Sequence, residues 1–220
     1  MNHTARLSTA TLLAMLLGSY LYSASVDAAE YRDISRVNGG IRISAEEQMG
    51  DLSSVNGGID LARGSSAHGI DTVNGGIDLD EQVVIANAET VNGGIRVGSD
   101  VTVNGSLGTV NGGIRTDSGT VIQNRVRTVN GKIQLRNTLV GEDVQTTNGD
   151  IVLRDGSTVE GDIVVKGRRS WMSRLFNYNG KPPTISIDAD SSVKGDIHLY
   201  REVNLEIDDN AEVGDVIRHY

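Results

Sequence analysis

The stretch Thr72-Val73-Asn74-Gly75-Gly76-Ile77-Asp78-Leu79 contains the motif on which the fold depends. Its centre, Val-Asn-Gly-Gly-Ile, occurs five times, and two looser copies follow at 129–133 and 147–151. Successive copies begin 18 or 19 residues apart, and self-similarity at a fixed period is the signature of a repeat architecture. The five strict copies begin at Val37, Val55, Val73, Val91 and Val110.

Aligned on the Asn, the repeats place apolar residues in fixed columns. Apolar and polar residues alternate in Ile77-Asp78-Leu79 and its equivalents, and this period of two predicts strands with one buried face. Helices are excluded by the glycine content, because each Gly would cost a helix about 1 kcal/mol. The columns are Val37, Val55, Val73, Val91, Val110 and Val129; Ile41, Ile59, Ile77, Ile95, Ile114, Ile133 and Ile151; Ile43, Leu61, Leu79, Val97, Thr116, Leu135 and Leu153; and Leu52, Ile70, Ala88, Leu107, Val126 and Val144.

Two all-β folds fit such a repeat. In a single-stranded parallel β-helix, or β-solenoid, each repeat is one coil and equivalent residues stack about 4.8 Å apart. In an antiparallel meander, each Asn-Gly closes a two-residue hairpin. Identity within the columns favours the β-solenoid, because only a coiled stack sets each Asn over the next, where the amides can hydrogen-bond as a ladder. At each corner we expect Gly to supply a positive φ and Asn to tolerate the left-handed region. The predicted ladder is Asn38, Asn56, Asn74, Asn92, Asn111, Asn130 and Asn148.

The composition excludes several classes of function. The 220 residues carry a net charge of -9, which argues against general binding to nucleic acid, whose affinity depends on neutralising phosphates. The absence of Cys excludes a disulfide framework, a thiolate nucleophile and a cysteine zinc site. The chain has one Trp and one Phe, and no aromatic residue lies between Tyr31 and Trp171. The coils must therefore be filled by thin layers of Val, Ile and Leu.

The first 28 residues have the layout of a bacterial secretory signal peptide. Arg6 precedes an apolar run, Ala10–Leu21, and a stretch of small residues follows. The run is shorter than the roughly 20 residues that span a bilayer. Val26 and Ala28 suit the −3 and −1 positions of a cleavage site, so we expect a mature domain at 29–220 with no transmembrane segment. The predicted location is the periplasm or the outside of the cell.

The pattern changes after the Asn-Gly-Gly coils at 34–153. Gly-Asp-Ile recurs in 154–165 and 185–220, and between these coils lies an insertion, 166–184, with a predicted short helix or loop. The insertion contains basic and aromatic residues of the kind enriched in interface hot spots. It either covers a flank of the solenoid as a flap or docks an envelope partner. The candidate partner-binding residues are Lys166, Arg168, Arg169, Trp171, Arg174, Phe176 and Lys181.

Two resemblances follow from these repeats. The Val-Asn-Gly-Gly-Ile copies behind a signal peptide resemble the adhesin family of secreted bacterial β-strand-repeat proteins. The Gly-Asp-Ile part, from Val159 to Ile217, is similar to the polymer-forming bactofilins. These resemblances imply a right-handed β-helix with a structural, scaffold or adhesive role at the cell envelope. They also imply an envelope protein, a glycan or a second copy as partner, and they supply no catalytic residue.

Candidates for chemistry are few. His68, His198 and His219 match no zinc-binding spacing, and we assign no catalytic residue, metal ligand or cofactor. The alternatives are a periplasmic polymer-forming scaffold and a β-helical polysaccharide lyase or hydrolase, which would need clustered carboxylates. Acidic residues do occur close together, but at positions where Asp is ordinary turn chemistry. These acidic groups are Asp78, Asp80 and Glu81; Asp188 and Asp190; and Asp208 and Asp209.

Overall fold

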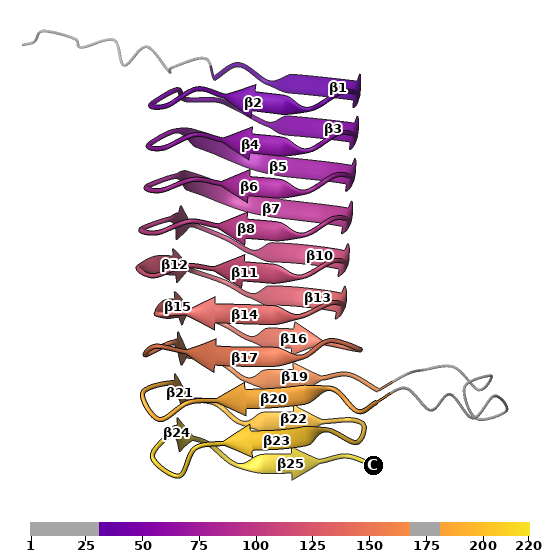
Figure 1. Cartoon of the computed structure of the whole chain (residues 1–220), viewed down its shortest axis with the longest axis vertical. Coiled ribbons are helices and arrows are strands. Elements are labelled where there is room, and N and C mark those ends of the chain that lie inside the picture. The colour runs from indigo at the N-terminus through magenta and orange to yellow at the C-terminus, as the bar shows by residue number, and fades with distance from the viewer. Residues whose placement is uncertain (1–30, 168–180) are drawn as a thin grey trace, which may run out of the picture. The chain divides into compact units, whose positions relative to one another are not determined.

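Residues 31–167 and 181–220 are described by a computed structural model, and they form a β-solenoid (Figure 1). All strand pairs among these residues are parallel, and each strand pairs with its equivalent in the next turn. The β-solenoid prediction is confirmed and the antiparallel meander is wrong. No helix occurs in this described part of the chain.

Each turn of the solenoid has three faces. The first face is a nine-stranded sheet of β2 (Ile41–Ile43), β4 (Ile59–Leu61), β6 (Ile77–Leu79), β8 (Ile95–Val97), β11 (Ile114–Thr116), β14 (Ile133–Arg136), β17 (Ile151–Arg154), β20 (Thr184–Ile187) and β23 (Asn204–Ile207). The second face holds β9 (Thr102–Val103), β12 (Thr120–Ile122), β15 (Thr138–Val140), β18 (Thr158–Val159), β21 (Ser192–Val193) and β24 (Glu212–Val213). The third face holds β1 (Ile34–Asn38), β3 (Leu52–Asn56), β10 (Leu107–Asn111), β13 (Val126–Asn130), β16 (Val144–Thr146), β19 (Ile163–Val165), β22 (Ile197–Leu199) and β25 (Val216–Arg218).

Two long strands join the second and third faces. β5 (Ser66–Asn74) and β7 (Val84–Asn92) run through the bend between them, so these two faces form one 16-stranded sheet. The chain passes from the third face through the Asn-Gly corner to the first face, and then through a second corner to the second face. After β19 ends at Val165, the parallel register resumes at β20, where Ile185 pairs with Ile151 of β17.

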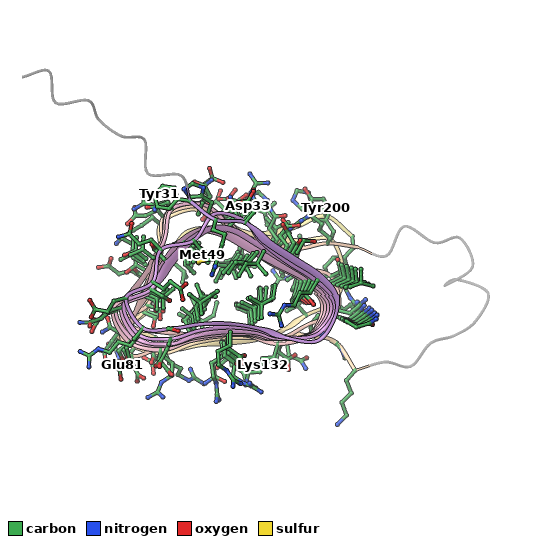
Figure 2. The ribbon with its side chains drawn as sticks, turned by 90° about the horizontal axis from the view of Figure 1, so that it is seen from above. Tyr31, Asp33, Met49, Glu81, Lys132 and Tyr200 are labelled. Carbon is green, nitrogen blue, oxygen red and sulfur yellow. The ribbon has the colours of Figure 1, made fainter. Side chains whose placement is uncertain are left out.

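The core is built from three of the predicted columns. The columns that begin at Ile41, Ile43 and Leu52 point inward, and all of their side chains are at most 3% exposed. Seen down the axis, side chains of successive turns superpose (Figure 2). The layers inside the solenoid are therefore aliphatic and continuous from turn to turn.

The Val column lies on the outside, contrary to the expectation that all four columns share a buried face. Its six members are 38–66% exposed. From Val55 onward, the inward position before each Val is taken by Ser or Thr, whose hydroxyl donates a hydrogen bond to a Gly carbonyl of the preceding corner. Thr72 reaches the oxygen of Gly57 at 2.9 Å, and Thr90 reaches that of Gly75 at 2.9 Å. The hydroxyl must point inward to reach this carbonyl. Because successive side chains of a strand point to opposite faces, the Val that follows faces outward.

Glycine is needed at the Asn-Gly corner because the backbones of successive turns approach each other closely there. In most turns it does not supply a positive φ. The first Gly of the motif lies outside the left-handed region in most turns, with Gly39 and Gly131 as the exceptions, and no ladder Asn has a positive φ. A Cβ on Gly75 would overlap the carbonyl of Gly57, whereas a Cβ on Gly76 would lie 3.3 Å from the oxygen of Gly94. The expected left-handed Asn-Gly geometry is wrong.

The left-handed region is used at the corner between the first and second faces. Glu46, Gln82 and Asp100 occupy it there with φ of 64°, 59° and 57°, and Gly64 occupies it with φ 69°. Because acidic and amide side chains alternate with Gly at this position, the sequence shows no repeated motif there.

The Gly-Asp-Ile repeat marks the third corner, where the chain enters the third face. Each Asp accepts the backbone N–H of the equivalent residue one turn on. Asp143 accepts from Asp162 at 3.1 Å, Asp162 from Asp196 at 2.9 Å, and Asp196 from Asp215 at 2.9 Å. The two sequence repeats therefore mark two different corners of the same coil.

The seven Asn side chains form a continuous ladder on the outer surface. Each Nδ2 donates to the Oδ1 of the Asn one turn before, at 2.8–3.2 Å. At the last member, Asn148, the Oδ1 accepts a hydrogen bond from Nη1 of Arg201 at 2.8 Å. Because Arg201 follows β22, its side chain spans the position at which the insertion replaces an Asn-Gly corner.

We predict that Asn74→Ala lowers the free energy of unfolding by about 1 kcal/mol, because it removes one donated and one accepted amide bond that water replaces only in part. Asn124→Ala is the matched control, since Asn124 is exposed and lies outside the ladder. Urea unfolding followed by circular dichroism measures both. Equal costs for the two variants would show that the ladder contributes nothing.

Candidate functional site

Two of the seven predicted partner-binding residues lie in the described part of the chain. Lys166 follows β19 and Lys181 precedes β20, and both are exposed. The structure therefore places both at the junction of the insertion with the solenoid. The other five, Arg168, Arg169, Trp171, Arg174 and Phe176, lie outside the described residues.

A groove runs along the third face of the solenoid. It has a volume of about 680 Å³ and extends from β1 to the end of β19, parallel to the axis of the solenoid. Of the two predicted residues that the structure describes, Lys166 lines the groove and Lys181 does not. The groove is lined by Ser35, Arg36, Val37, Ser53, Ser54, Val55, Asp71, Thr72, Val73, Glu89, Thr90, Val91, Ser106, Gly108, Thr109, Val110, Arg125, Arg127, Thr128, Val129, Gln145, Thr146, Thr147 and Lys166.

Two outward columns form the edges of this groove. One is the Val column from Val37 to Val129, which we call the valine stripe. The other lies two residues earlier in each strand, and we call it the polar column. Register pairing defines its members as Ser35, Ser53, Asp71, Glu89, Gly108, Arg127 and Gln145. An apolar edge thus faces a polar edge over successive turns.

The sequence contained a signal for the valine stripe that the column analysis missed. Leu52 and Val55 are separated by an odd number of residues within β3. Successive side chains of a strand point to opposite faces, so two such residues cannot both be buried. The burial of Leu52 therefore places Val55 outside.

The polar column is basic toward one end and acidic in its middle. The guanidinium of Arg127 pairs with the carboxylate of Glu89 at 2.9 Å, across the gap left by Gly108. Beside the column, Arg125 pairs with Glu142 at 3.2 Å. Both pairs are about half exposed, so each contributes at most about 1 kcal/mol to stability.

Within the polar column, the carboxyl group of Asp71 has a raised pKa. Partial burial raises the pKa of Asp71, and the negative charges of Glu89 and Asp51 raise it further. Within the described residues, no hydrogen bond or ion pair reaches its carboxylate. The groove therefore contains a carboxylate with no basic partner among residues 31–167 and 181–220.

A second, shallower hollow lies on the first face. Two ion pairs lie there, Arg42 with Asp60 at 3.1 Å and Arg96 with Asp78 at 2.8 Å. All four side chains are largely exposed, so these pairs add little to stability. Asp80 also lines this hollow, so two guanidinium groups lie among three carboxylates and the net charge is small.

The histidines and the acidic groups do not converge on one site. His68 lies edge-on to Tyr31, with ring centroids 4.9 Å apart. His198 Nδ1 lies 3.1 Å from His219 Nε2, and the Nε2 atom of His198 lies 3.5 Å from the carboxylate of Asp162. Across 31–167 and 181–220, no group of three or more His, Cys, Asp or Glu could hold a metal ion.

Three of the acidic residues named from the sequence accept hydrogen bonds from backbone N–H groups at turns. Asp188 accepts the backbone N–H of Asp155 at 2.8 Å, and Asp208 accepts that of Asn210 at 3.0 Å. Asp80 accepts the N–H of Glu81 at 2.9 Å. These carboxylates therefore bind backbone groups of the corners rather than gather in a cleft.

Comparison of the chain with protein-family models, with curated proteins and with solved structures finds no match in any of the three sets. Within the residues that the structure describes, no helix has the length and hydropathy needed to cross a membrane.

We predict that Asp71→Asn raises the melting temperature at pH 7. A raised folded-state pKa means that the charged carboxylate destabilises the fold, fully above the folded pKa and not at all below the unfolded value of about 3.9. The gain should therefore vanish at about pH 3. Thermal melts at both pH values measure it, with Asp209→Asn, at an exposed acid outside the groove, as control. A gain that is equal at both pH values would contradict the electrostatic cause.

Proposed function

We propose that this protein is a non-catalytic structural or adhesive element of the bacterial cell envelope, located in the periplasm or outside the cell. The observation that carries the proposal is the set of hydrogen-bonded columns that join each turn to the next. The Asn ladder, the Thr hydroxyls on corner carbonyls and the Asp carboxylates on backbone N–H groups act at different corners. A turn cannot shift relative to its neighbours without breaking several of these bonds together.

The outer surface supports the same proposal. Columns such as the valine stripe repeat one side chain at the strand spacing of about 4.8 Å. A surface of this kind presents an extended, periodic face instead of a single closed pocket. It suits a partner that is itself extended along the solenoid, and this is the requirement of a scaffold or an adhesin.

The insertion gives the proposal its second element. Lys166 and Lys181 are exposed at its two ends, on the described side of the junction. With Arg168, Arg169 and Arg174 between them, the segment is basic, whereas the whole chain has a charge of -9. This local charge favours an anionic envelope component, such as an acidic glycan, as the docking partner.

Export and envelope association test the proposal. We expect fractionated cells to contain the protein outside the cytoplasm with Ala29 as its first residue, by intact-mass measurement. Purified envelope material should retain it, and Arg168→Gln with Arg169→Gln should weaken retention in a salt-dependent way. The matched control is Arg63→Gln with Arg115→Gln, which removes the same charge from the described solenoid surface.

Three results would contradict parts of this proposal. Intact Met1 on cytoplasmic protein would exclude export. Equal retention of both double variants would exclude docking through the insertion. If Trp171→Ala with Phe176→Ala lowers the melting temperature and leaves retention unchanged, the insertion is a flap.

A further inference from the structure

The valine stripe is an exposed apolar ladder with the regularity of a strand stack. Five of its six members, Val55 to Val129, are 38–41% exposed, so successive turns present nearly the same surface. The turns stack in register, and equivalent side chains of successive turns lie nearly over one another (Figures 1 and 2). Stacks of parallel strands in close register are stabilised by stacking against a second sheet or by side-chain ladders such as the Asn ladder.

The spacing of the valines along the stripe determines which surface packs closely against it. Identical side chains that repeat at about 4.8 Å pack most closely against another ladder of the same pitch, as in the dry interfaces between paired cross-β sheets. A second copy of this chain carries such a ladder. We propose that two copies associate through their third faces, with the solenoids antiparallel and valine stripe against valine stripe.

The antiparallel orientation is the one that brings the two polar columns together as well as the two stripes. A two-fold axis along the strand direction places each stripe over the stripe of the second copy, and each polar column over its equivalent. A two-fold axis along the solenoid, placed over the stripe, would also set valine against valine, but it would place the two polar columns on opposite sides of the stripe and out of contact. An isologous contact of the first kind is self-complementary and closes at two copies.

Charge fixes the register of the two copies. In the register that centres all six valines, Asp71 would face Glu89 of the second copy, and like charges directly opposite are unfavourable. If one copy slides by one turn, Glu89 lies opposite Glu89 of the second copy, and this is again a pair of like charges. A slide of two turns places Arg127 opposite Asp71 of the second copy and Glu89 opposite Gly108, while Val91 faces Val110.

This register also brings a positively charged side chain of the second copy to Asp71. Asp71 has no cation partner within the described residues, and its carboxylate lies among Glu89 and Asp51. Arg127 reaches along the polar column to Glu89 at 2.9 Å, so its guanidinium lies on the outer surface beside the stripe. In the dimer, each Arg127 would turn from its position over Gly108, where it pairs with its own Glu89, to meet Asp71 of the second copy.

Sedimentation velocity over a range of protein concentrations tests the contact. We expect a concentration-dependent dimer that Val91→Lys with Val110→Lys abolishes. Val84→Lys is the control, because Val84 is 42% exposed on the second face and should leave the dimer intact. Circular dichroism verifies that each variant is folded. A monomer at every concentration, or a dimer unaffected by the stripe variant, would overturn the proposal and leave the stripe to a different partner.

Cross-linking tests the register separately. The chain contains no Cys, so single-cysteine variants report only the designed contact. Mixed Val91→Cys and Val110→Cys chains should form a disulfide-linked dimer on oxidation, and mixed Val91→Cys and Val73→Cys chains should not. Preferential linkage of the second mixture would show the centred register and contradict the pairing of Asp71 with Arg127. The dimer concerns the solenoid itself, so it would hold even if the protein were not an envelope component.

Discussion

Close contact between backbones at the Asn-Gly corner is the constraint on which the rest of the structure depends. The first Gly of each corner lies against the carbonyl of the corner before it, with no space for a side-chain atom. This approach aligns equivalent residues, so that each Asn amide meets the next and each Thr hydroxyl reaches a corner carbonyl. The second Gly is less restricted, and Lys132 and Asp150 replace it in the two looser copies. The first is retained in both, as Gly131 and Gly149.

Much of the fold could be predicted from this motif, because stacking in register turns sequence identity into columns. The Ile41, Ile43 and Leu52 columns, the Asn contacts and the resumption of the register after the insertion all follow from the period. The conformation of the corners did not follow. Asn-Gly is a familiar left-handed signal, but here backbone contact, and not φ, requires the Gly. The left-handed residues, such as Gln82 and Asp100, lie at a corner whose sequence varies from turn to turn.

The candidate site was harder to predict than the fold. The basic and aromatic insertion was visible as a break in the period, whereas the groove arises from residues that the period itself repeats. Val55 could have been placed outside by the alternation of β3, but Asp71 and Arg127 stand in a column of mixed residue types. Their relation to one another depends on which turn each occupies, and it emerges only from the pairing of β5, β7, β10 and β13.

A comparison of two adjacent glycines tests the role of the corner most directly. The account predicts that Gly75→Ala lowers the free energy of unfolding by about 3 kcal/mol or more, because a methyl group there must displace the backbone of the preceding turn. Gly76→Ala should cost about 1 kcal/mol or less, since its Cβ would lie 3.3 Å from the nearest atom. Equal costs for the two variants in urea unfolding would show that close packing of the corners does not hold the turns in register.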